Sequence, residues 1–121
     1  MKEINIDNFI LRIGQNQYEN DELIKKSKQN DYWFHLKEHP SPHGVLEYHS
    51  NIPKDIFKKC AIEIQNHSKY PNERVIYTQI KNVIRTDKPG LVITKKVKIV
   101  SIKYLFSLAI IFLPYKGILF L

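Results

Sequence analysis

The feature that most constrains the fold is one strongly amphipathic helix set among short, strand-like segments. Within residues 53–68, apolar side chains recur at helical spacing, and Ile56, Cys60 and Ile64 form the centre of the stripe. Pro53 suits a first helical position, and the Tyr-Pro-Asn sequence at 70–72 ends the pattern. A helix with one apolar face must bury that face against another element. We therefore expect this helix to cover one face of an antiparallel sheet.

The remaining segments predict a small α+β domain. A second, shorter helix is expected at residues 20–29, with Asn20 as its N-cap. In the segment 32–37, alternation places Phe34 and Leu36 on one face of a strand, and Trp33, His35 and Lys37 on the other. Strands are expected at 4–13, 32–37, 45–48, 74–78, 90–94 and 96–103. The prediction for residues 1–103 is thus a small, mostly antiparallel sheet packed with two helices.

Charge is concentrated in one part of the chain. Of the formal net charge of +7, residues 73–103 contribute +6, from eight Lys or Arg against two Asp or Glu. A localised basic segment is typical of proteins that bind a polyanion, either nucleic acid or an anionic membrane surface. The alternative is a solvated strand edge on which lysines oppose aggregation. The candidate phosphate-binding cations in this segment are Lys81, Arg85, Lys88, Lys95, Lys96 and Lys98.

Candidate base-binding and catalytic residues are fewer. Trp33, His35 and Lys37 on one strand face would form a platform for a nucleobase and a phosphate, unless Trp33 is simply a core residue. His43 follows in a proline-containing loop, and Pro40 and Pro42 exclude the helix that would align the neighbouring histidines for zinc. Cys60 lies on the apolar stripe, as a core cysteine would. We therefore expect no metal, no cofactor and no catalytic activity.

Five motifs in the same order resemble the NFACT-R domain family. The most specific is DYWFHLKEHPSPH at residues 31–43, which is similar to the family pattern D-x-W-F-H-x-K-[DE]-x-P-x-x-H. GQNQYENDEL at 14–23, Ile-Pro at 52–53, VIYTQIKNV at 75–83 and KPGLV at 88–92 match further family motifs. The resemblance covers most of the chain and implies an RNA-binding α+β domain.

In the family, this domain is found at the C-terminus of proteins that bind the large ribosomal subunit with peptidyl-tRNA during ribosome-associated quality control. The resemblance therefore implies tRNA, rRNA or the ribosome as partner. Stand-alone coiled-coil relatives also exist, and one has been described as a membrane receptor for DNA, so DNA is a further possible partner. Gln15 stands where the family has arginine, which removes one phosphate contact.

The last 18 residues, 104–121, differ from the rest because they carry a single charge, on Lys116. Pro114 and Gly117 interrupt this apolar tail, which is short for a membrane-spanning helix. A buried terminal element, a membrane anchor and a frame-shift artefact remain as alternatives. The first interpretation of the whole chain is a non-catalytic RNA-binding module. The second is a membrane-associated protein that binds DNA or anionic lipid. One cysteine excludes an internal disulfide, so a cytoplasmic location is expected.

Overall fold

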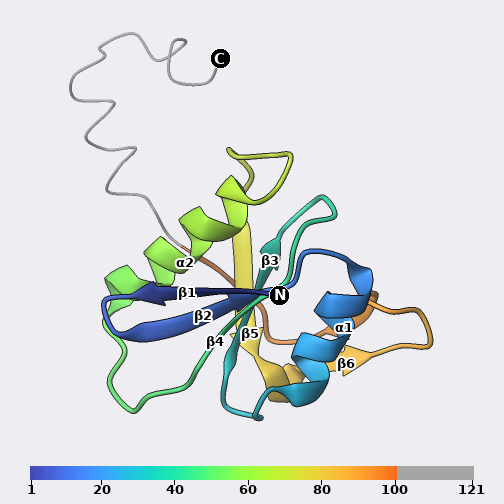
Figure 1. Cartoon of the computed structure of the whole chain (residues 1–121), viewed down its shortest axis with the longest axis horizontal. Helices are drawn as coiled ribbons and strands as arrows, with labels where there is room; N and C mark the ends of the chain where they lie inside the picture. Colours follow the sequence, from blue (N-terminus) through green and yellow to red (C-terminus); the bar gives the residue numbers. More distant parts are fainter. Residues whose placement is uncertain (101–121) are drawn as a thin grey trace, which may run out of the picture.

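The computed structural model describes residues 1–100, and it contains two helices, eight strands and one 3-10 turn within that range (Figure 1). In chain order the elements are β1 (Lys2–Ile6), β2 (Phe9–Ile13), α1 (Gln17–Lys26), β3 (Tyr32–Leu36), β4 (Gly44–Leu46), α2 (Lys54–Asn66), β5 (Val75–Gln79), the 3-10 turn (Ile80–Asn82), β6 (Val83–Arg85), β7 (Val92–Thr94) and β8 (Lys98–Ile99). The predicted tail, 104–121, lies outside the described residues, so the boundary at 103 stays a prediction.

Six of the strands form one sheet in the order β1-β2-β4-β3-β5-β8, and every neighbouring pair in it is antiparallel. β6 and β7 form a separate antiparallel hairpin. With two helices and a mostly antiparallel sheet, the α+β fold class is confirmed. β3 is central to this sheet because it pairs with β4 on one side and with β5 on the other.

α2 packs on one face of the sheet through the predicted stripe. Ile56, Cys60 and Ile64 are 2%, 0% and 0% exposed, and they share a core cluster with Phe34 and Leu36 of β3. Burial raises the pKa of the Cys60 thiol to about 12, so this cysteine stays protonated and fills space rather than acting as a nucleophile. The predicted packing of this helix is confirmed.

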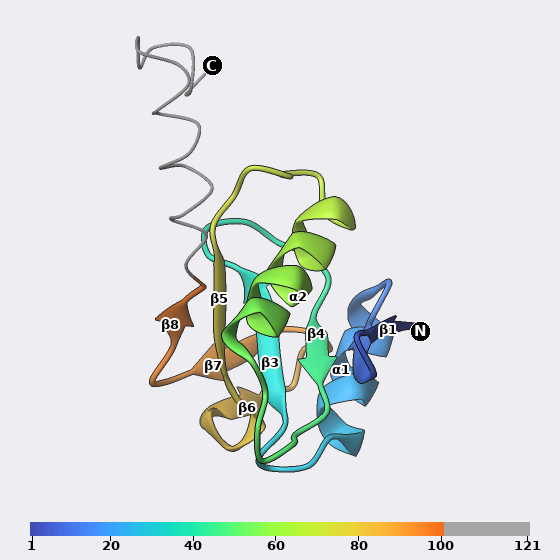
Figure 2. The same cartoon turned by 90° about the vertical axis from the view of Figure 1, so that its left-hand side faces the viewer.

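The opposite face of the sheet carries a second, smaller core. Trp33 of β3 is 2% exposed and packs with Leu23 and Ile24 of α1 and with Val83 of β6. Figure 2 shows α2 in front of the sheet, with α1 at the right and the β6–β7 hairpin at the lower left. The alternation predicted for β3 is therefore confirmed, because Phe34 and Trp33 enter different cores.

The expected strand at 4–13 is wrong, because the segment folds back on itself. β1 and β2 pair from Lys2 with Ile13 to Ile6 with Phe9. The two residues between them, Asp7 and Asn8, have φ of 50° and 73°. Two positive φ angles in a two-residue connection define the type I′ hairpin turn, in which Asp and Asn are tolerated. The Asp-Asn pair was the available signal for this turn.

The expected start of the first helix at Asn20 is also wrong. α1 spans Gln17–Lys26 and its N-cap is Asn16, four residues before the predicted cap; the Asn16 side chain accepts hydrogen bonds from the backbone N–H groups of Tyr18 and Glu19, both at 3.0 Å. Asn20 is instead buried within the helix. No strand is predicted at Val83–Arg85, and the structure places β6 there. Three residues carry too little alternation to be recognised as a strand.

The turn between β1 and β2 gives a test of the hairpin. Asn8→Ala places alanine, which disfavours the left-handed backbone conformation, at a φ of 73°. The variant should therefore lower the free energy of unfolding by about 1 kcal/mol. Asn8→Gly, which has no β-carbon, should not be destabilising. The measurement is urea unfolding, with Asn51→Ala in an exposed loop as control. Equal stabilities of the two Asn8 variants would contradict the turn.

Candidate nucleic-acid interface

The sequence motifs meet in space around one buried histidine. His43 lies in the loop that leads into β4 and is 2% exposed. Residues from β2, α1, β3 and the loop before β7 surround it, and we call this group the His43 cluster: Gly14, Asn20, Trp33, His35, His43 and Gly90. The sequence separations within the cluster are large, so only folding brings these residues together.

A hydrogen bond between two side chains fixes the centre of the cluster. The Nε1–H of Trp33 donates to Nδ1 of His43 at 3.0 Å. Only an unprotonated Nδ1 can accept, so the proton of a neutral His43 lies on Nε2. The backbone of Gly90 is a hydrogen-bond partner of the same imidazole. The ring is therefore held between β3 and the loop that precedes β7.

Burial keeps both histidines of the cluster neutral. Desolvation lowers the pKa of His43 to about 3, and the nearby His35 acts in the same direction. Desolvation also lowers the pKa of His35, whose ring stacks on Trp33 with centroids 5.5 Å apart and meets His43 edge-on at 5.0 Å. Protonation of either ring would place a charge in this core. The pair therefore acts as neutral hydrogen-bonding and packing groups near pH 7.

Close approach of the backbone explains the glycine at position 14. Its N–H donates to the carbonyl of His43 at 3.0 Å, and Oδ1 of Asn20 accepts from the N–H of His43 at 3.2 Å. A β-carbon on Gly14 would lie 2.2 Å from the same Asn20 oxygen. Asn20 thus links α1 to the His43 loop, a role that the sequence did not indicate.

The KPG turn closes the cluster from the other side. Gly90 has a φ of +82°, a conformation that side chains disfavour, and a β-carbon there would lie 3.2 Å from the backbone of Gln17. Lys88 and Pro89 precede it in an exposed position and a half-buried position respectively. The turn therefore reaches the start of α1 and covers His43 at the same time.

The structure brings the predicted platform residues Trp33, His35 and Lys37 to one surface groove. Trp33 is a core residue with its indole N–H already bonded, so little of its ring is open to a base. His35 is partly exposed and borders a second groove as well. Lys37 lies just after β3 and contacts the carboxylate of Glu38 at 3.7 Å. His43 is as buried as Trp33 and accepts its hydrogen bond.

The lysines of the basic segment separate into groups. Thr78 of β5 is 5% exposed and donates to the carbonyl oxygens of Lys95 and Lys96, each at 3.2 Å. The side-chain amide of Asn82 donates a hydrogen bond to the same hydroxyl, and the backbone carbonyl of Asn82 accepts one from the N–H of Lys95. We call Lys81, Lys95 and Lys96 the lysine corner. Within residues 1–100, none of these three exposed side chains has an acidic partner.

A fixed turn holds the lysine corner in place. Lys96 has a φ of 56°, which is unfavourable for a residue with a β-carbon. The hydrogen bonds from Thr78 to the carbonyls of Lys95 and Lys96 hold the turn in this conformation. Lys98 follows on the edge strand β8, where it lies opposite Tyr77. It is exposed and adjoins the corner along the chain.

The other two predicted cations lie at the far end of the β6–β7 hairpin. Arg85 forms a two-pronged ion pair with Asp21 of α1, with N–O distances of 3.0 and 2.8 Å. The ion pair joins the hairpin to the helix. The side-chain hydrogen bond between Arg85 and Asp21 raises the pKa of Arg85. Lys88 is exposed in the turn beyond it. Arg85 is therefore partly neutralised, whereas Lys88 and the lysine corner keep their charge.

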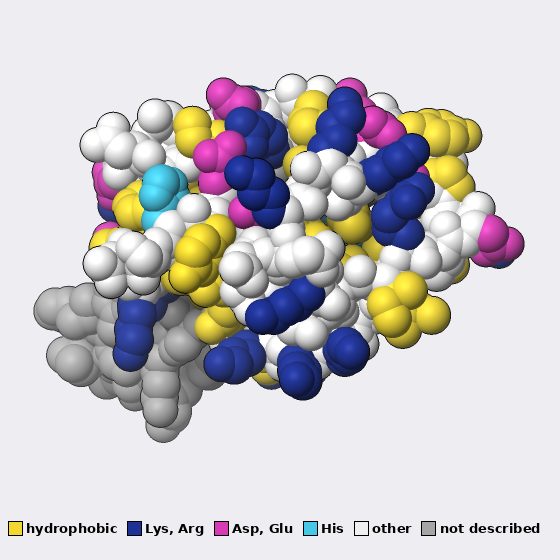
Figure 3. Space-filling view, turned by 90° about the horizontal axis from the view of Figure 1, so that it is seen from below, with side chains coloured by type: hydrophobic (Ala, Val, Ile, Leu, Met, Phe, Trp, Pro, Cys, Tyr) yellow, Lys and Arg dark blue, Asp and Glu magenta, His cyan; other side chains and the backbone are white. Residues whose placement is uncertain are grey.

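Seen from below, the molecule shows a face with many basic side chains (Figure 3). Lys and Arg side chains lie in both its upper and its lower part; acidic side chains accompany them in the upper part and are not seen in the lower part. Exposed apolar side chains lie between the basic ones, and the exposed apolar residues of the basic segment include Ile84, Ile93 and Val97. Such a surface fits phosphate contacts better than base reading.

Neither a metal centre nor a membrane-spanning helix is found in the part of the chain that the structure describes. Within residues 1–100 there is no group of three or more His, Cys, Asp or Glu side chains placed to hold a metal ion. No helix in that same range has the length and apolar character needed to cross a membrane. The tail on which the anchor interpretation depends lies beyond it.

The neutral state of the His43 cluster predicts how stability depends on pH. Because burial lowers the pKa of His43 from 6.5 to about 3, the unfolded chain binds more protons than the folded chain between these values. The free energy of unfolding should therefore fall as the pH drops below 6.5, by about 1.4 kcal/mol per pH unit for this histidine. His35 adds to the fall in the same direction.

The variant His43→Asn tests this assignment. Asparagine keeps an acceptor for the Trp33 N–H but cannot be protonated, so chemical unfolding between pH 7 and 5 should show a shallower loss of stability than in the unmodified protein. His49→Asn changes an exposed histidine outside the cluster and should keep the steep profile. A profile for His43→Asn as steep as that of the unmodified chain would contradict the role of His43.

Comparison with known proteins agrees with the motifs. The family described as "NFACT protein RNA binding domain" matches residues 2–99. The chain is 31% identical over 114 residues to coiled-coil domain-containing protein 25 from Bos taurus and from Mus musculus, in each case covering 83% of this chain and 55% of the relative. The chain thus spans about half the length of the curated relatives it matches.

A solved structure is also similar. The C-terminal part of the fibronectin/fibrinogen-binding protein from Streptococcus suis superposes with a TM-score of 0.71 and 26% sequence identity, covering 82% of this chain and 43% of that one. The family match extends over nearly all of the described residues and includes both the His43 cluster and the lysine corner. The chain therefore belongs to the NFACT protein RNA-binding domain family.

Proposed function

We propose that this domain binds RNA through its phosphates and that the lysine corner provides the main contacts. The observation that carries the proposal is the set of exposed lysines without acidic partners among residues 1–100, held on a turn that Thr78 fixes. Family membership supports RNA as the polyanion. Lysine is a point charge that contacts phosphate without selecting a base, so the binding should depend strongly on salt and weakly on sequence.

We propose further that the RNA is transfer or ribosomal RNA. The support is the resemblance to domains that act on the large ribosomal subunit, together with the burial of Trp33, which leaves little of its ring open to a base. A structured RNA of known shape suits a surface that contacts backbone phosphates. The lysine corner would also attract the phosphates of DNA, so duplex DNA belongs in the same binding comparison.

The domain would act by binding rather than by chemistry. The side chains that could serve as nucleophile or base in the described core are held in structural roles: Cys60 is a buried thiol with a pKa near 12, and His43 accepts from Trp33. A cytoplasmic location fits a ribosomal partner and remains part of the proposal.

Neutralising the lysine corner tests the proposed function. The triple variant Lys81→Gln, Lys95→Gln, Lys96→Gln should bind tRNA more weakly, and the slope of log K against log salt should decrease by about 2–3, because each lost phosphate contact removes about 0.7–0.9. The measurement is fluorescence anisotropy of labelled tRNA at salt concentrations from about 50 to about 300 mM.

The matched control removes three charges from the other side of the sheet. Lys54→Gln, Lys58→Gln, Lys59→Gln changes α2, which covers the face opposite to the β6–β7 hairpin, and alters the net charge equally. Its salt slope should stay close to that of the unmodified protein. If both triple variants lower the slope by the same amount, only net charge matters and the lysine corner has no special role.

A further inference from the structure

A groove lies beside the His43 cluster, at the end of the sheet near the start of α1. It has a volume of about 600 Å³, within the range of about 300–1,000 Å³ usual for small-ligand sites. Four segments form its walls: the residues that begin α1, the loop of residues 40–43, the turn of residues 67–70 that follows α2, and the turn of residues 89–91 before β7. The polar side chains that matter for the argument are Gln17, His35, Ser41, His67, Lys69 and Tyr70.

The charge of this groove favours an anionic ligand. No Asp or Glu lines it, and Lys69 is the single Lys or Arg on its wall. Lys69 is exposed, and no acidic side chain among residues 1–100 pairs with it. Amide, hydroxyl and imidazole groups supply hydrogen-bonding capacity along the remaining wall. A ligand with one phosphate and a flat polar group would match these features.

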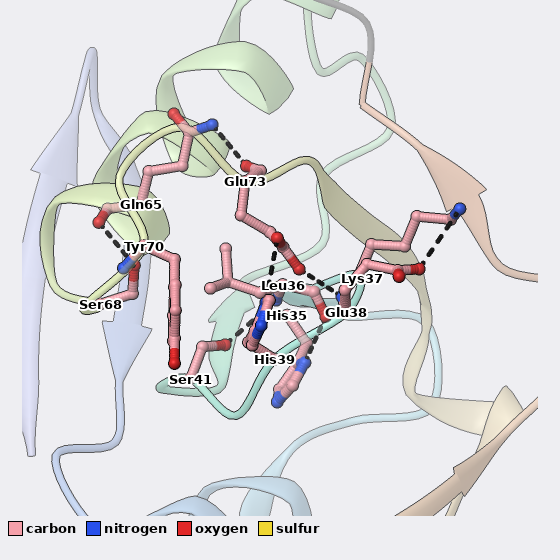
Figure 4. Close-up of polar contacts among 10 residues, drawn as sticks. All are labelled: His35, Leu36, Lys37, Glu38, His39, Ser41, Gln65, Ser68, Tyr70 and Glu73. Carbon is pink, nitrogen blue, oxygen red and sulfur yellow. Dashed lines mark hydrogen bonds and ion pairs between the residues drawn. The ribbon is translucent and has the colours of Figure 1, made fainter. Parts of the chain in front are cut away.

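Tyr70 gives the groove an aromatic surface that is held in place. Its ring is 41% exposed and stacks on His39, with centroids 4.0 Å apart and planes at 19°. His39 is fixed in turn by Glu73, whose carboxylate lies 3.2 Å from Nδ1. Figure 4 shows Tyr70 standing beside Ser41, with His39 and Glu73 on the side of the neighbouring loop. Tyr70 lines the groove and His39 does not.

The turn that carries Tyr70 is itself well fixed. The N–H of Tyr70 donates to Oγ of Ser68 at 3.0 Å, and its carbonyl accepts from the N–H of Glu73 at 3.1 Å. Gln65 of α2 donates to the carbonyl of Glu73 at 2.7 Å. An aromatic ring already oriented by its neighbours loses little freedom when a second ring stacks on it.

We infer that this groove takes one unpaired nucleotide of the RNA, with the base stacked on Tyr70 and a phosphate near Lys69; the inference rests on the proposed function and deepens it. A base in a duplex has no free face, so only an extruded or single-stranded nucleotide can stack in this way. β7 leads from Leu91 at the groove to Lys95 at the lysine corner, a distance of about 13 Å along the strand. One RNA strand can therefore reach both sites.

The test compares two RNA duplexes that differ by one nucleotide. A perfectly paired RNA hairpin and the same hairpin with one bulged 2-aminopurine are titrated with the intact chain. The bulged RNA should bind more tightly by about 5- to 100-fold, the range expected for stacking one base on an aromatic ring. The 2-aminopurine fluorescence should be quenched on binding, because the base stacks on Tyr70.

Variants of exposed tyrosines locate the effect. Tyr70→Ala should remove the preference for the bulged RNA and the quenching, while the affinity for the paired hairpin stays the same; Tyr70→Phe should keep both. Tyr48→Ala is the matched control, since Tyr48 is 45% exposed and lies outside the groove. Thermal unfolding of each variant shows whether the fold is kept, and the Phe variant preserves the test if the Ala variant unfolds.

The outcomes separate this inference from the proposed function. Equal affinity of the unmodified chain for both RNAs, or a preference that survives Tyr70→Ala, would overturn the nucleotide site while leaving phosphate binding intact. Failure of the unmodified chain to bind either RNA in a salt-dependent way would overturn the proposed function itself. A preference lost equally in Tyr48→Ala and Tyr70→Ala would also overturn the inference, because it would not be specific to the groove.

Discussion

The hydrogen bond from Trp33 to His43 is the interaction on which the arrangement of this domain depends. It joins β3 to the loop before β4 inside the smaller core, where an unpaired indole N–H or imidazole nitrogen would be costly. Because His43 also contacts Gly14, Asn20 and Gly90 through its backbone or ring, one residue sets the positions of α1 and of the β6–β7 hairpin. The lysine corner adjoins the β6–β7 hairpin, and the start of α1 and the turn before β7 form part of the wall of the groove beside the His43 cluster.

The two faces of the sheet carry cores of different composition. The face under α2 carries the larger of the two hydrophobic clusters. The face under α1 is smaller and contains polar groups, all of them hydrogen-bonded within the described residues. A polar core that is fully bonded specifies one geometry more sharply than an apolar one. This property suits the face that positions the turns and loops at the surface.

The cations of the basic segment show why charge alone does not locate a binding site. Arg85 is the strongest phosphate-binding side-chain type in the set, yet its guanidinium is matched to Asp21 and serves to fasten the hairpin to α1. The lysines near Thr78 carry the same formal charge but keep it exposed on a fixed turn. Each of these side chains adds one positive charge to the chain, and only their partners differ.

The sequence by itself determined the fold class, the packing of α2 and the alternation of β3, because these follow from local periodicity in residues 32–37 and 53–68. It also determined the family, through motifs that are contiguous in the chain. Only the tertiary structure decided the hairpin at Asp7, the N-cap at Asn16, the burial of Trp33 and the pairing of Arg85. Each of these depends on contacts between residues distant in sequence or on a local backbone conformation. Such features produce no periodic pattern in the sequence.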